Sequence, residues 1–415
     1  MSSTAQLTLF PIADKAVKVT FDGGQISSDG GLLLLREVER QLGLIKDLAA
    51  LIPDHRDQRY IDHSYIDLLM QRVAQIAAGY EDGNDSTELR HDPIIKMMVN
   101  RAPEQGAALA SQPTMCRFEN APSRTTLYRL AQVFVNVFLN TYTEPPPVIV
   151  LDFDDTATIT HGNQQLTLFN GFYNEHCYMP LHVYEGLSGK LITTILKPGK
   201  RSKGTELLPI LKRVVIAIRQ RWSKTLIIIR GDGHFSAPQP MAWMNQQNKV
   251  GFVTGLSVNP RLKKHVEAHL ERAKKTYEKT SQKVTLFHSF YYKADSWETM
   301  QRIVAKVEVS DQGTNIRFVV TSFTQAKATD LYKIAYCGRG QDENYIKDHK
   351  RYLKSDRALR ASRRLLFNGA AHPMNNIART DGMNARGEDD GLKFQAAGDT
   401  RPGAQGGQSY RRWAC

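Results

Sequence analysis

The sequence predicts an α/β fold, in which a mostly helical N-terminal region precedes a domain built around a sheet. Between residues 31 and 140, apolar residues recur at helical spacing. After residue 148, short β-branched apolar runs alternate with longer amphipathic segments, a pattern typical of strands and helices that share one sheet. Residues 283–323 then contain successive strand-like runs, which predict a small antiparallel insertion.

In the N-terminal region, residues 1–20 predict a loose arm or a short strand. The polar stretch at 79–93 predicts a turn and a short helix, because it is rich in Gly, Asp and Asn. The three prolines at 145–147 end the region, since proline neither continues a helix nor donates to a strand ladder. Three amphipathic helices are predicted before them, at residues 32–42, 65–78 and 125–139.

The domain after the prolines is predicted from its alternating pattern. Strands are expected at residues 148–153, 190–196, 226–229 and 251–256. Amphipathic helices are expected at residues 205–222 and 260–278. The insertion is expected to contain strands at residues 284–292, 303–309 and 316–322, with a turn at 311–313.

The composition favours a soluble protein with a polyanionic partner. The 415 residues suggest two or three domains, and the formal net charge of +13 favours nucleic acid, although solvated surface lysines would give the same total. The four cysteines lack metal-ligand spacing, so neither a zinc site nor a disulfide framework is expected. Without a signal peptide or an apolar run of about 18 residues, we expect a cytoplasmic protein with no membrane partner.

Carboxylates follow two of the predicted strands. Asp152 and Asp154 should point to one face of their strand and Asp155 to the other, because side chains alternate. Asp232 follows the strand at 226–229, between two glycines that allow close approach. Buried strand ends rarely carry carboxylates unless a cation meets them. Strand-end solvation, helix capping or a plain turn would explain each aspartate singly.

The stretch YCGRGQDENYIKDHK carries the most informative pattern in the chain. Tyr336, Arg339, Glu343 and Lys350 lie at offsets of 3, 7 and 14 residues. At about 100° per residue, these side chains would share one face of an α-helix. That face would combine an aromatic ring, two cations and one carboxylate, which suits a metal beside a phosphate backbone. The simpler interpretation of the glutamate is an exposed helical residue paired with Lys347.

This spacing, Y-x2-R-x3-E-x6-K, resembles the signature of DDE transposases in the insertion-sequence 4-like supergroup. The stretches DGGQISSDGGLLLLRE, GYEDGNDSTELRHDP, LDFDDTATITHGNQ and RGDGHF resemble recurrent blocks of its insertion-sequence 1380 family. The resemblance covers roughly residues 15–355. It implies an RNase H-like catalytic domain at 148–255 and 324–355, a helix plus β-rich insertion at 256–323, and a DNA-end-binding region at 1–144.

The resemblance also implies the catalytic residues and their chemistry. By position, the catalytic triad and metal ligands would be Asp154, Asp232 and Glu343, with Asp152 as a competitor for the first place. Asp154 is preferred because the D-x-T step of the motif matches Asp154 and Thr156. Carboxylates of this kind hold Mg²⁺, or Mn²⁺ as a substitute, in pairs of ions. The implied reaction is cut-and-paste cleavage and strand transfer by a homodimer on DNA, at terminal inverted repeats and a target.

Further residues would contact DNA. The resemblance implies that Arg339 and Lys350 grip phosphates and that Tyr336 touches the same strand. Trp297 would be a stacking platform, although a tryptophan beside strands is more often a core residue. The basic loop at 197–203 offers Lys200, Arg201 and Lys203, either as phosphate contacts or as solvated surface.

Two other interpretations stay open from the sequence. Asp152 and Asp154 also fit the D-x-D-x-T motif of haloacid-dehalogenase-like phosphatases, as nucleophile and general acid/base. In addition, residues 356–415 depart from the family pattern, and we expect a disordered or frameshifted tail there. A transposase remnant that binds DNA without cutting it would carry such a tail.

Overall fold

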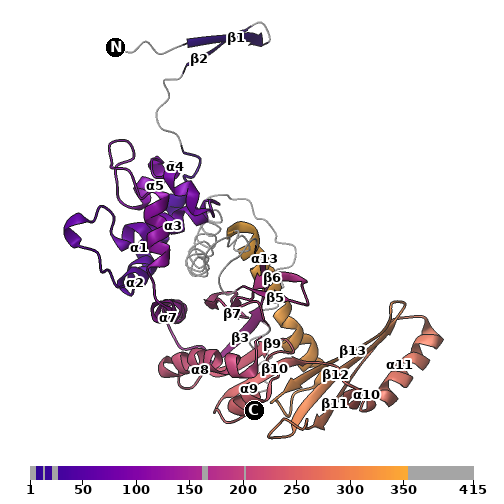
Figure 1. The fold of residues 1–415 in the computed structure, drawn as a ribbon. Helices are drawn as coiled ribbons and strands as arrows, with labels where there is room; N and C mark the ends of the chain where they lie inside the picture. The colour runs from indigo at the N-terminus through magenta and orange to yellow at the C-terminus, as the bar shows by residue number, and fades with distance from the viewer. Residues whose placement is uncertain (1–5, 13–14, 21–26, 161–166, 201, 354–415) are drawn as a thin grey trace. The chain divides into compact units, whose positions relative to one another are not determined.

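The computed structural model describes residues 6–12, 15–20, 27–160, 167–200 and 202–353. The expected tail at 356–415 and Arg201 lie outside this part of the chain. Contacts divide the chain into two compact units, Met1–Ala121 and Pro122–Cys415. Figure 1 shows the first from indigo to violet, and the second from violet through magenta and orange to yellow.

The first unit is helical apart from two strands. The strands β1 (Gln6–Ile12) and β2 (Lys15–Thr20) pair antiparallel. The helices predicted at 32–42 and 65–78 are confirmed as α1 and α3, and the stretch at 79–93 contains a short turn and a short helix as expected. The helices of this unit are α1 (Leu32–Leu42), α2 (Leu44–Ala50), α3 (Tyr65–Ala77), α4 (Ser86–Leu89), α5 (Pro93–Met98) and α6 (Gln112–Asn120).

A buried ion pair holds the middle of this unit together. The guanidinium of Arg72, on α3, lies 2.6 Å from the carboxylate of Glu119 on α6, and the two side chains are 0% and 4% exposed. Arg72 also donates to the carbonyl oxygens of Tyr80 and Glu81. One side chain therefore fixes α3, α6 and the connection after α3.

The second unit is built on an eight-stranded mixed sheet, in the order β11-β12-β13-β10-β9-β3-β7-β8. The central strands β3, β9 and β10 are parallel, and the remaining neighbours are antiparallel. The strands are β3 (Val148–Asp155), β7 (Leu181–Glu185), β8 (Leu191–Ile195), β9 (Leu226–Gly231), β10 (Val250–Leu256), β11 (Val284–Tyr292), β12 (Gln301–Ser310) and β13 (Gly313–Thr321). A second sheet has the order β4-β6-β5, with β4 at Thr158–Ile159, β5 at Leu168–Asn170 and β6 at Glu175–Tyr178.

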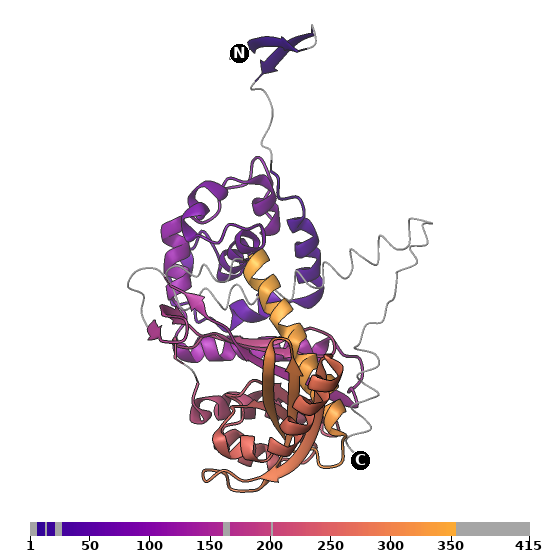
Figure 2. The ribbon, with the colours of Figure 1, turned by 90° about the vertical axis from the view of Figure 1, so that its right-hand side faces the viewer.

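The two faces of the large sheet bury different side chains of the same strands. Ile149, Leu151 and Phe153 of β3 join a core with the helices α7 (Arg124–Asn140), α8 (Gly204–Arg221) and α9 (Pro238–Asn245). The alternate residues Val148 and Val150 face the segment that leads into α13 (Gly340–Leu353). Figure 2 turns this arrangement by 90°, with α13 in yellow-orange. Alternation along the strands therefore decides which helices each side chain meets.

One sequence prediction in this region needs correction, and another is confirmed. The single helix expected at 260–278 is two helices, α10 (Pro260–Lys264) and α11 (Glu267–Thr280), because the chain bends at His265 and Val266 to bury Val266 completely. The three strands expected at residues 284–322 are confirmed as the antiparallel neighbours β11, β12 and β13. They continue the main sheet, since β13 pairs with β10 through Val253 and Thr321.

The Arg72–Glu119 pair leads to a stability prediction. Arg72→Met should lower the free energy of unfolding by about 3–5 kcal/mol, because it leaves a buried carboxylate without its cation. Urea denaturation of the whole protein measures the change. Arg59→Met is the matched control, because Arg59 pairs with Asp57 at the surface and is 79% exposed, so a change of less than about 1 kcal/mol is expected. Equal losses in the two variants would contradict this.

Candidate active site

Parallel pairing brings two aspartates to the same end of the sheet. In the β3–β9 register, Asp152 lies opposite Arg230 and Phe153 lies opposite Gly231. The next positions on the two chains are Asp154 and Asp232. Side chains alternate along a strand, so Asp154 and Asp232 point to the same face as Val150 and Ile228. That face packs against the segment before α13. The two carboxylates therefore leave adjacent strands on one face.

Asp152 is closed off inside the protein. Its carboxylate forms a two-point ion pair with the guanidinium of Arg230, and the two side chains are 0% and 1% exposed. Arg230 also donates to the carbonyl oxygen of Ala335, 2.9 Å away. A Cβ atom on Gly186 would lie only 2.1 Å from Asp152 Oδ2, so the pair is covered by backbone. A phosphatase nucleophile has to reach its substrate, and this aspartate has no access to solvent.

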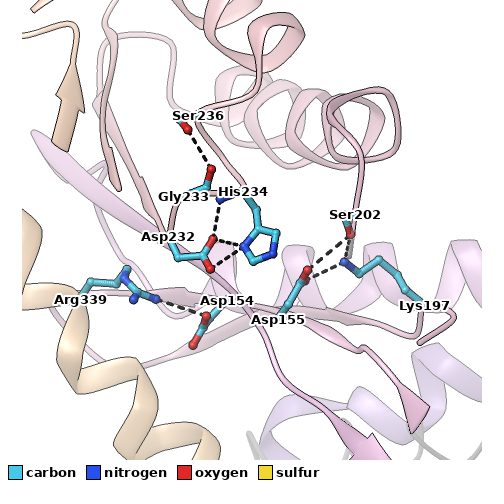
Figure 3. A network of polar contacts seen from close by, with 9 residues as sticks. All are labelled: Asp154, Asp155, Lys197, Ser202, Asp232, Gly233, His234, Ser236 and Arg339. Atoms are coloured by element: carbon cyan, nitrogen blue, oxygen red, sulfur yellow. Dashed lines mark hydrogen bonds and ion pairs between the residues drawn. The ribbon is translucent and has the colours of Figure 1, made fainter. Parts of the chain in front are cut away.

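Asp154 is half-buried and faces a cation. Its Oδ1 atom lies 3.2 Å from Arg339 Nη1, and its side chain is 17% exposed (Figure 3). Burial raises the pKa of Asp154 from 3.8 to about 6, against the lowering effect of Arg339. The charges of Asp232, Asp155 and Glu343 raise it further. The raised pKa of Asp154 thus reflects burial first and the neighbouring carboxylates second.

Asp232 is held by the turn that follows β9. Its carboxylate accepts from the backbone N–H of His234 at 2.9 Å and lies 2.5 Å from His234 Nδ1. Burial alone would raise the pKa of Asp232, but the hydrogen bonds and charge of His234 lower it below its usual value. The Ser236 hydroxyl donates to the carbonyl oxygen of Gly233, 2.8 Å away, and so fixes the turn. His234 was not expected from the sequence, although it lies two residues after Asp232.

Asp155 points to the other face, as strand alternation predicts. Its carboxylate accepts from Lys197 Nζ at 2.7 Å, and Ser202 lies beside them (Figure 3). Lys197, the first lysine of the basic loop, is therefore engaged in an internal ion pair, and it is only 8% exposed. Lys200 and Lys203 of the same loop are exposed.

The signature segment is not one α-helix, which corrects the sequence prediction. Leu331–Tyr336 is a π-helix, Cys337–Arg339 is a 3-10 turn, and α13 begins only at Gly340. A π turn widens the backbone and often occurs at functional sites. Here the π turn precedes Arg339, which is the last residue of the 3-10 turn and whose side chain reaches Asp154.

Three of the four signature side chains, Arg339, Lys350 and Tyr336, nevertheless lie at the strand ends. The ammonium of Lys350 donates to the Thr156 hydroxyl at 2.5 Å and to the Ala157 carbonyl at 2.9 Å, just beyond β3. Tyr336 lies against β10, since a Cβ atom on Gly255 would be 2.8 Å from its hydroxyl oxygen. Glu343 is exposed in the first turn of α13.

A further carboxyl group, Asp342, is buried beside Glu343 and is 0% exposed. Burial and the neighbouring charge of Asp152 raise the pKa of Asp342 to about 10, so it carries a proton at neutral pH. This carboxyl group was not expected from the sequence. Helical spacing could have found it, because Asp342, Ile346 and His349 are buried at i, i+4 and i+7.

The donor set suits a hard divalent cation, because it consists of carboxylates that repel one another. Within the described ranges, however, no three His, Cys, Asp or Glu side chains stand close enough to hold a metal ion together. Asp154 is turned to Arg339 and Asp232 to His234. A bound cation would therefore replace these pairings.

The remaining expected DNA contact, Trp297, is buried. Its side chain is 7% exposed and meets Tyr292 edge-on, with ring centroids 5.7 Å apart. It belongs to the core that α10 and α11 cover. This is the core position that the sequence left as the alternative, and it offers no free ring face for stacking.

The fold and site define an α/β protein with carboxylates at the ends of adjacent strands and cations from a following helical segment. Residues 10–379 match the model of the family described as transposase DDE domain, group 1, and the chain belongs to this family. No curated protein matches it. Among solved structures, it is similar to a piggyBac transposase in a synaptic complex with hairpin DNA, at 12% identity and a TM-score of 0.40 over 88% of this chain and 83% of that one. No helix in the described part of the chain is long and apolar enough to span a membrane.

The electrostatics of Asp154 predict a pH effect on stability. Its pKa is raised from 3.8 to about 6 on folding, so between these values the folded protein holds a proton that the unfolded chain has lost. The free energy of unfolding should therefore fall as pH rises through this window, by up to about 3 kcal/mol for this group. Asp154→Asn should remove that part of the fall.

Urea denaturation in EDTA at pH 4 and pH 7.5 measures the difference between the variant and the wild type. The variant should gain stability relative to the wild type only at the higher pH. Asp295→Asn is the control, because Asp295 is 86% exposed in its pair with Arg261. The same gain at both pH values would show that Asp154 does not titrate in this window.

Proposed function

We propose that the protein is a DNA transposase of the insertion-sequence 1380 type, with an RNase H-like catalytic domain, that cleaves and joins DNA at the ends of its element. One observation carries the proposal. Asp154 and Asp232 occupy neighbouring positions at the carboxyl ends of two parallel strands, β3 and β9. Membership of the transposase family supplies the class of reaction.

In this proposal, Asp154, Asp232 and Glu343 hold two Mg²⁺ ions, or Mn²⁺ as a substitute; transposases with a DDE domain generally use divalent metal ions. When bound, such ions would act as Lewis acids. They would offset negative charge on the phosphodiester oxygens and favour deprotonation of the attacking oxygen. Asp152 keeps a structural role, since it is buried against Arg230. Arg339 then becomes free to pair with a phosphate oxygen, for which its planar guanidinium is suited.

The proposed path of the DNA is based on the positions of three lysines near the strand ends and on the basic loop. Lys350 is held at the end of β3 by Thr156 and Ala157, close to Asp154 in the chain. Lys200 and Lys203 are exposed on the loop before α8. We propose that these residues, with Tyr336, contact the backbone of the strand that is cut. The proposed partner surfaces are therefore the strand ends and this loop.

We also propose a separate role for each region of the chain. The region 1–144 binds the terminal inverted repeats, residues 148–255 and 324–355 carry the chemistry, and residues 256–323 form a helix plus β-rich insertion. The contact division between Ala121 and Pro122 lies within the first of these ranges. Two copies acting on two element ends would give the homodimer expected for cut-and-paste transposition.

The catalytic assignment predicts the behaviour of two variants. Asp232→Asn and Glu343→Gln should each slow metal-dependent cleavage by about 1,000-fold or more, because a lost metal ligand removes several kcal/mol of transition-state stabilisation. Their affinity for DNA should change little. The measurement is cleavage of a labelled fragment that carries the inverted repeat flanking the gene, with Mg²⁺ or Mn²⁺.

The matched control is Glu267→Gln, because Glu267 is exposed in the first turn of α11 as Glu343 is in the first turn of α13. It should cut like the wild type. If Glu343→Gln also cuts like the wild type, the assignment of this glutamate is wrong. If the wild type binds the repeat but never cuts, the chain is a DNA-binding remnant.

The basic loop predicts a change in salt dependence. Replacing both Lys200 and Lys203 by Gln should weaken DNA binding and reduce the slope of log affinity against log salt by up to about 2, at about 0.9 per phosphate contact. Fluorescence anisotropy of a labelled duplex measures this at several salt concentrations. The control replaces Lys224 and Lys249, which lie at the opposite ends of β9 and β10 from Asp232. If the wild type and both double variants have the same slope, Lys200 and Lys203 do not contact DNA phosphates and belong to the solvated surface.

A further inference from the structure

Lys197 is a buried cation that neither the proposed metal site nor the proposed DNA path uses. It lies on the loop that connects β8 to α8, and it is 8% exposed. Its ammonium donates to Asp155 Oδ1 at 2.7 Å and to the Ser202 hydroxyl, as Figure 3 shows. Since the Asp155 side chain is 3% exposed, Lys197 could reach a phosphate only by breaking a buried ion pair.

The two contacts of Lys197 tie both ends of the basic loop to β3. Ser202 follows Lys197 by five residues and is buried, and its hydroxyl also lies 3.5 Å from Asp155 Oδ2. Asp155 is the last residue of β3. One ammonium therefore joins the beginning of the loop, the end of the loop and the strand that carries Asp154.

Backbone contacts fix the first half of this loop. The Lys197 carbonyl oxygen accepts from the backbone N–H of Met179 at 3.0 Å. The Gly199 carbonyl oxygen accepts from the side-chain amide of Asn170 at 2.7 Å, and a Cβ atom on Gly199 would lie 2.2 Å from the Cys177 carbonyl oxygen. The loop up to Gly199 is therefore packed directly on the small sheet β4-β6-β5.

The second half of the loop carries the exposed cations. Lys200 and Lys203 are exposed, whereas Ser202, between them in the chain, is buried. Lys203 is the residue that precedes α8. The Ser202 hydroxyl is thus the point at which this half of the loop is attached to Lys197 and Asp155.

We propose that the contact between Lys197 and Ser202 positions the basic loop for DNA, so that Lys200 and Lys203 meet the phosphates of one strand together. This inference rests on the proposed function. Two ammonium groups in one short loop repel each other, and a free loop would have to be ordered when DNA binds. A loop that is closed in advance avoids that loss of conformational freedom. Lys197 and Ser202 therefore strengthen DNA binding without touching the DNA.

The contacts of this buried pair argue against two other roles. A serine beside a lysine can act as a nucleophile beside its base. Here, however, the lysine donates to the Ser202 hydroxyl and is also paired with Asp155, so it is not free to take the proton of the serine. A direct phosphate contact would need an exposed ammonium, and that of Lys197 is buried.

The test is a double-mutant cycle on DNA affinity. Ser202→Ala is made in the wild type and in the variant with both Lys200→Gln and Lys203→Gln. It keeps the ion pair between Lys197 and Asp155, so the fold should be retained. Anisotropy measures the affinity of the whole protein, in EDTA, for a labelled duplex that carries the inverted repeat flanking the gene. Ser202→Ala should weaken binding by about 5- to 50-fold in the wild type and by less than about 2-fold in the double variant.

Two further variants show whether the effect belongs to the loop. Thr225→Val removes another buried hydroxyl, which donates to the Pro146 carbonyl just before β9, and it should bind DNA like the wild type. Lys197→Met should weaken binding at least as much as Ser202→Ala, with the same dependence on the two exposed lysines, because it opens the loop from the other partner. If Ser202→Ala causes no loss, or an equal loss in the wild type and in the double variant, the positioning role is overturned. A loss in Lys197→Met alone would assign Lys197 to stability and overturn it as well.

Three results separate this inference from the proposed function. If replacing Lys200 and Lys203 weakens binding but Ser202→Ala does not, the positioning role is wrong and the proposed DNA path stands. If replacing the two lysines changes neither the affinity nor its salt dependence, the loop makes no phosphate contact and the positioning role is wrong, whereas cleavage of the repeat with Mg²⁺ would still support the transposase assignment. If the wild type neither binds nor cuts the repeat, both proposals are wrong.

Discussion

The buried contact between Arg230 and Asp152 is the interaction on which the site depends. It joins β9 to β3 side by side, and through the Ala335 carbonyl it also joins both strands to the segment before α13. Buried charges are stable only when they are paired and hydrogen-bonded, so all three partners have to be present. Two residues further along each strand lie Asp154 and Asp232. The pair thus fixes the strands from which these carboxylates project.

The balance of charge differs between Asp152 and Asp154, which lie two residues apart on β3. At Asp152, the carboxylate is matched by a guanidinium and closed to solvent. At Asp154, one guanidinium faces a group of carboxylates, and the pKa of Asp154 rises to about 6. A protein that only needed stability would not gather these charges. The rise in the pKa of Asp154 comes mainly from burial and further from the neighbouring carboxylates, and a bound cation would offset both effects.

Much of the fold could be predicted from the sequence, because its signals are local. The periodicity of α1 and α3 and the apolar runs of β3 and β9 mark these elements directly. The strand β7 was not expected, because Leu181–Glu185 is buried throughout and therefore shows no alternation. The π turn before Arg339 was also missed, since the spacing of the signature residues resembles that of a regular helix.

For the site, the sequence could identify carboxylates but not their partners. Asp152 and Asp154 have the same side-chain direction and nearly the same neighbours in sequence. Only the tertiary pairing of Arg230 with the first, and of Arg339 with the second, separates them. Trp297 and Phe172 show the same limit, because the identity of an aromatic residue does not say whether its ring is buried. The tryptophan is held in the core by the α10–α11 layer, whereas the phenylalanine stands at the tip of a short hairpin.

The position of that hairpin follows from the way β3 ends. A strand that continued straight beyond Asp155 would carry its backbone away from the carboxylates. Instead, the backbone N–H of Thr156 donates to the Pro180 carbonyl, and the chain enters the small sheet through β4. The Lys350 ammonium holds this turn from the side of α13. One change of direction after the last strand residue therefore brings a helix cation, two carboxylates and the hairpin β5–β6 to the same end of the sheet.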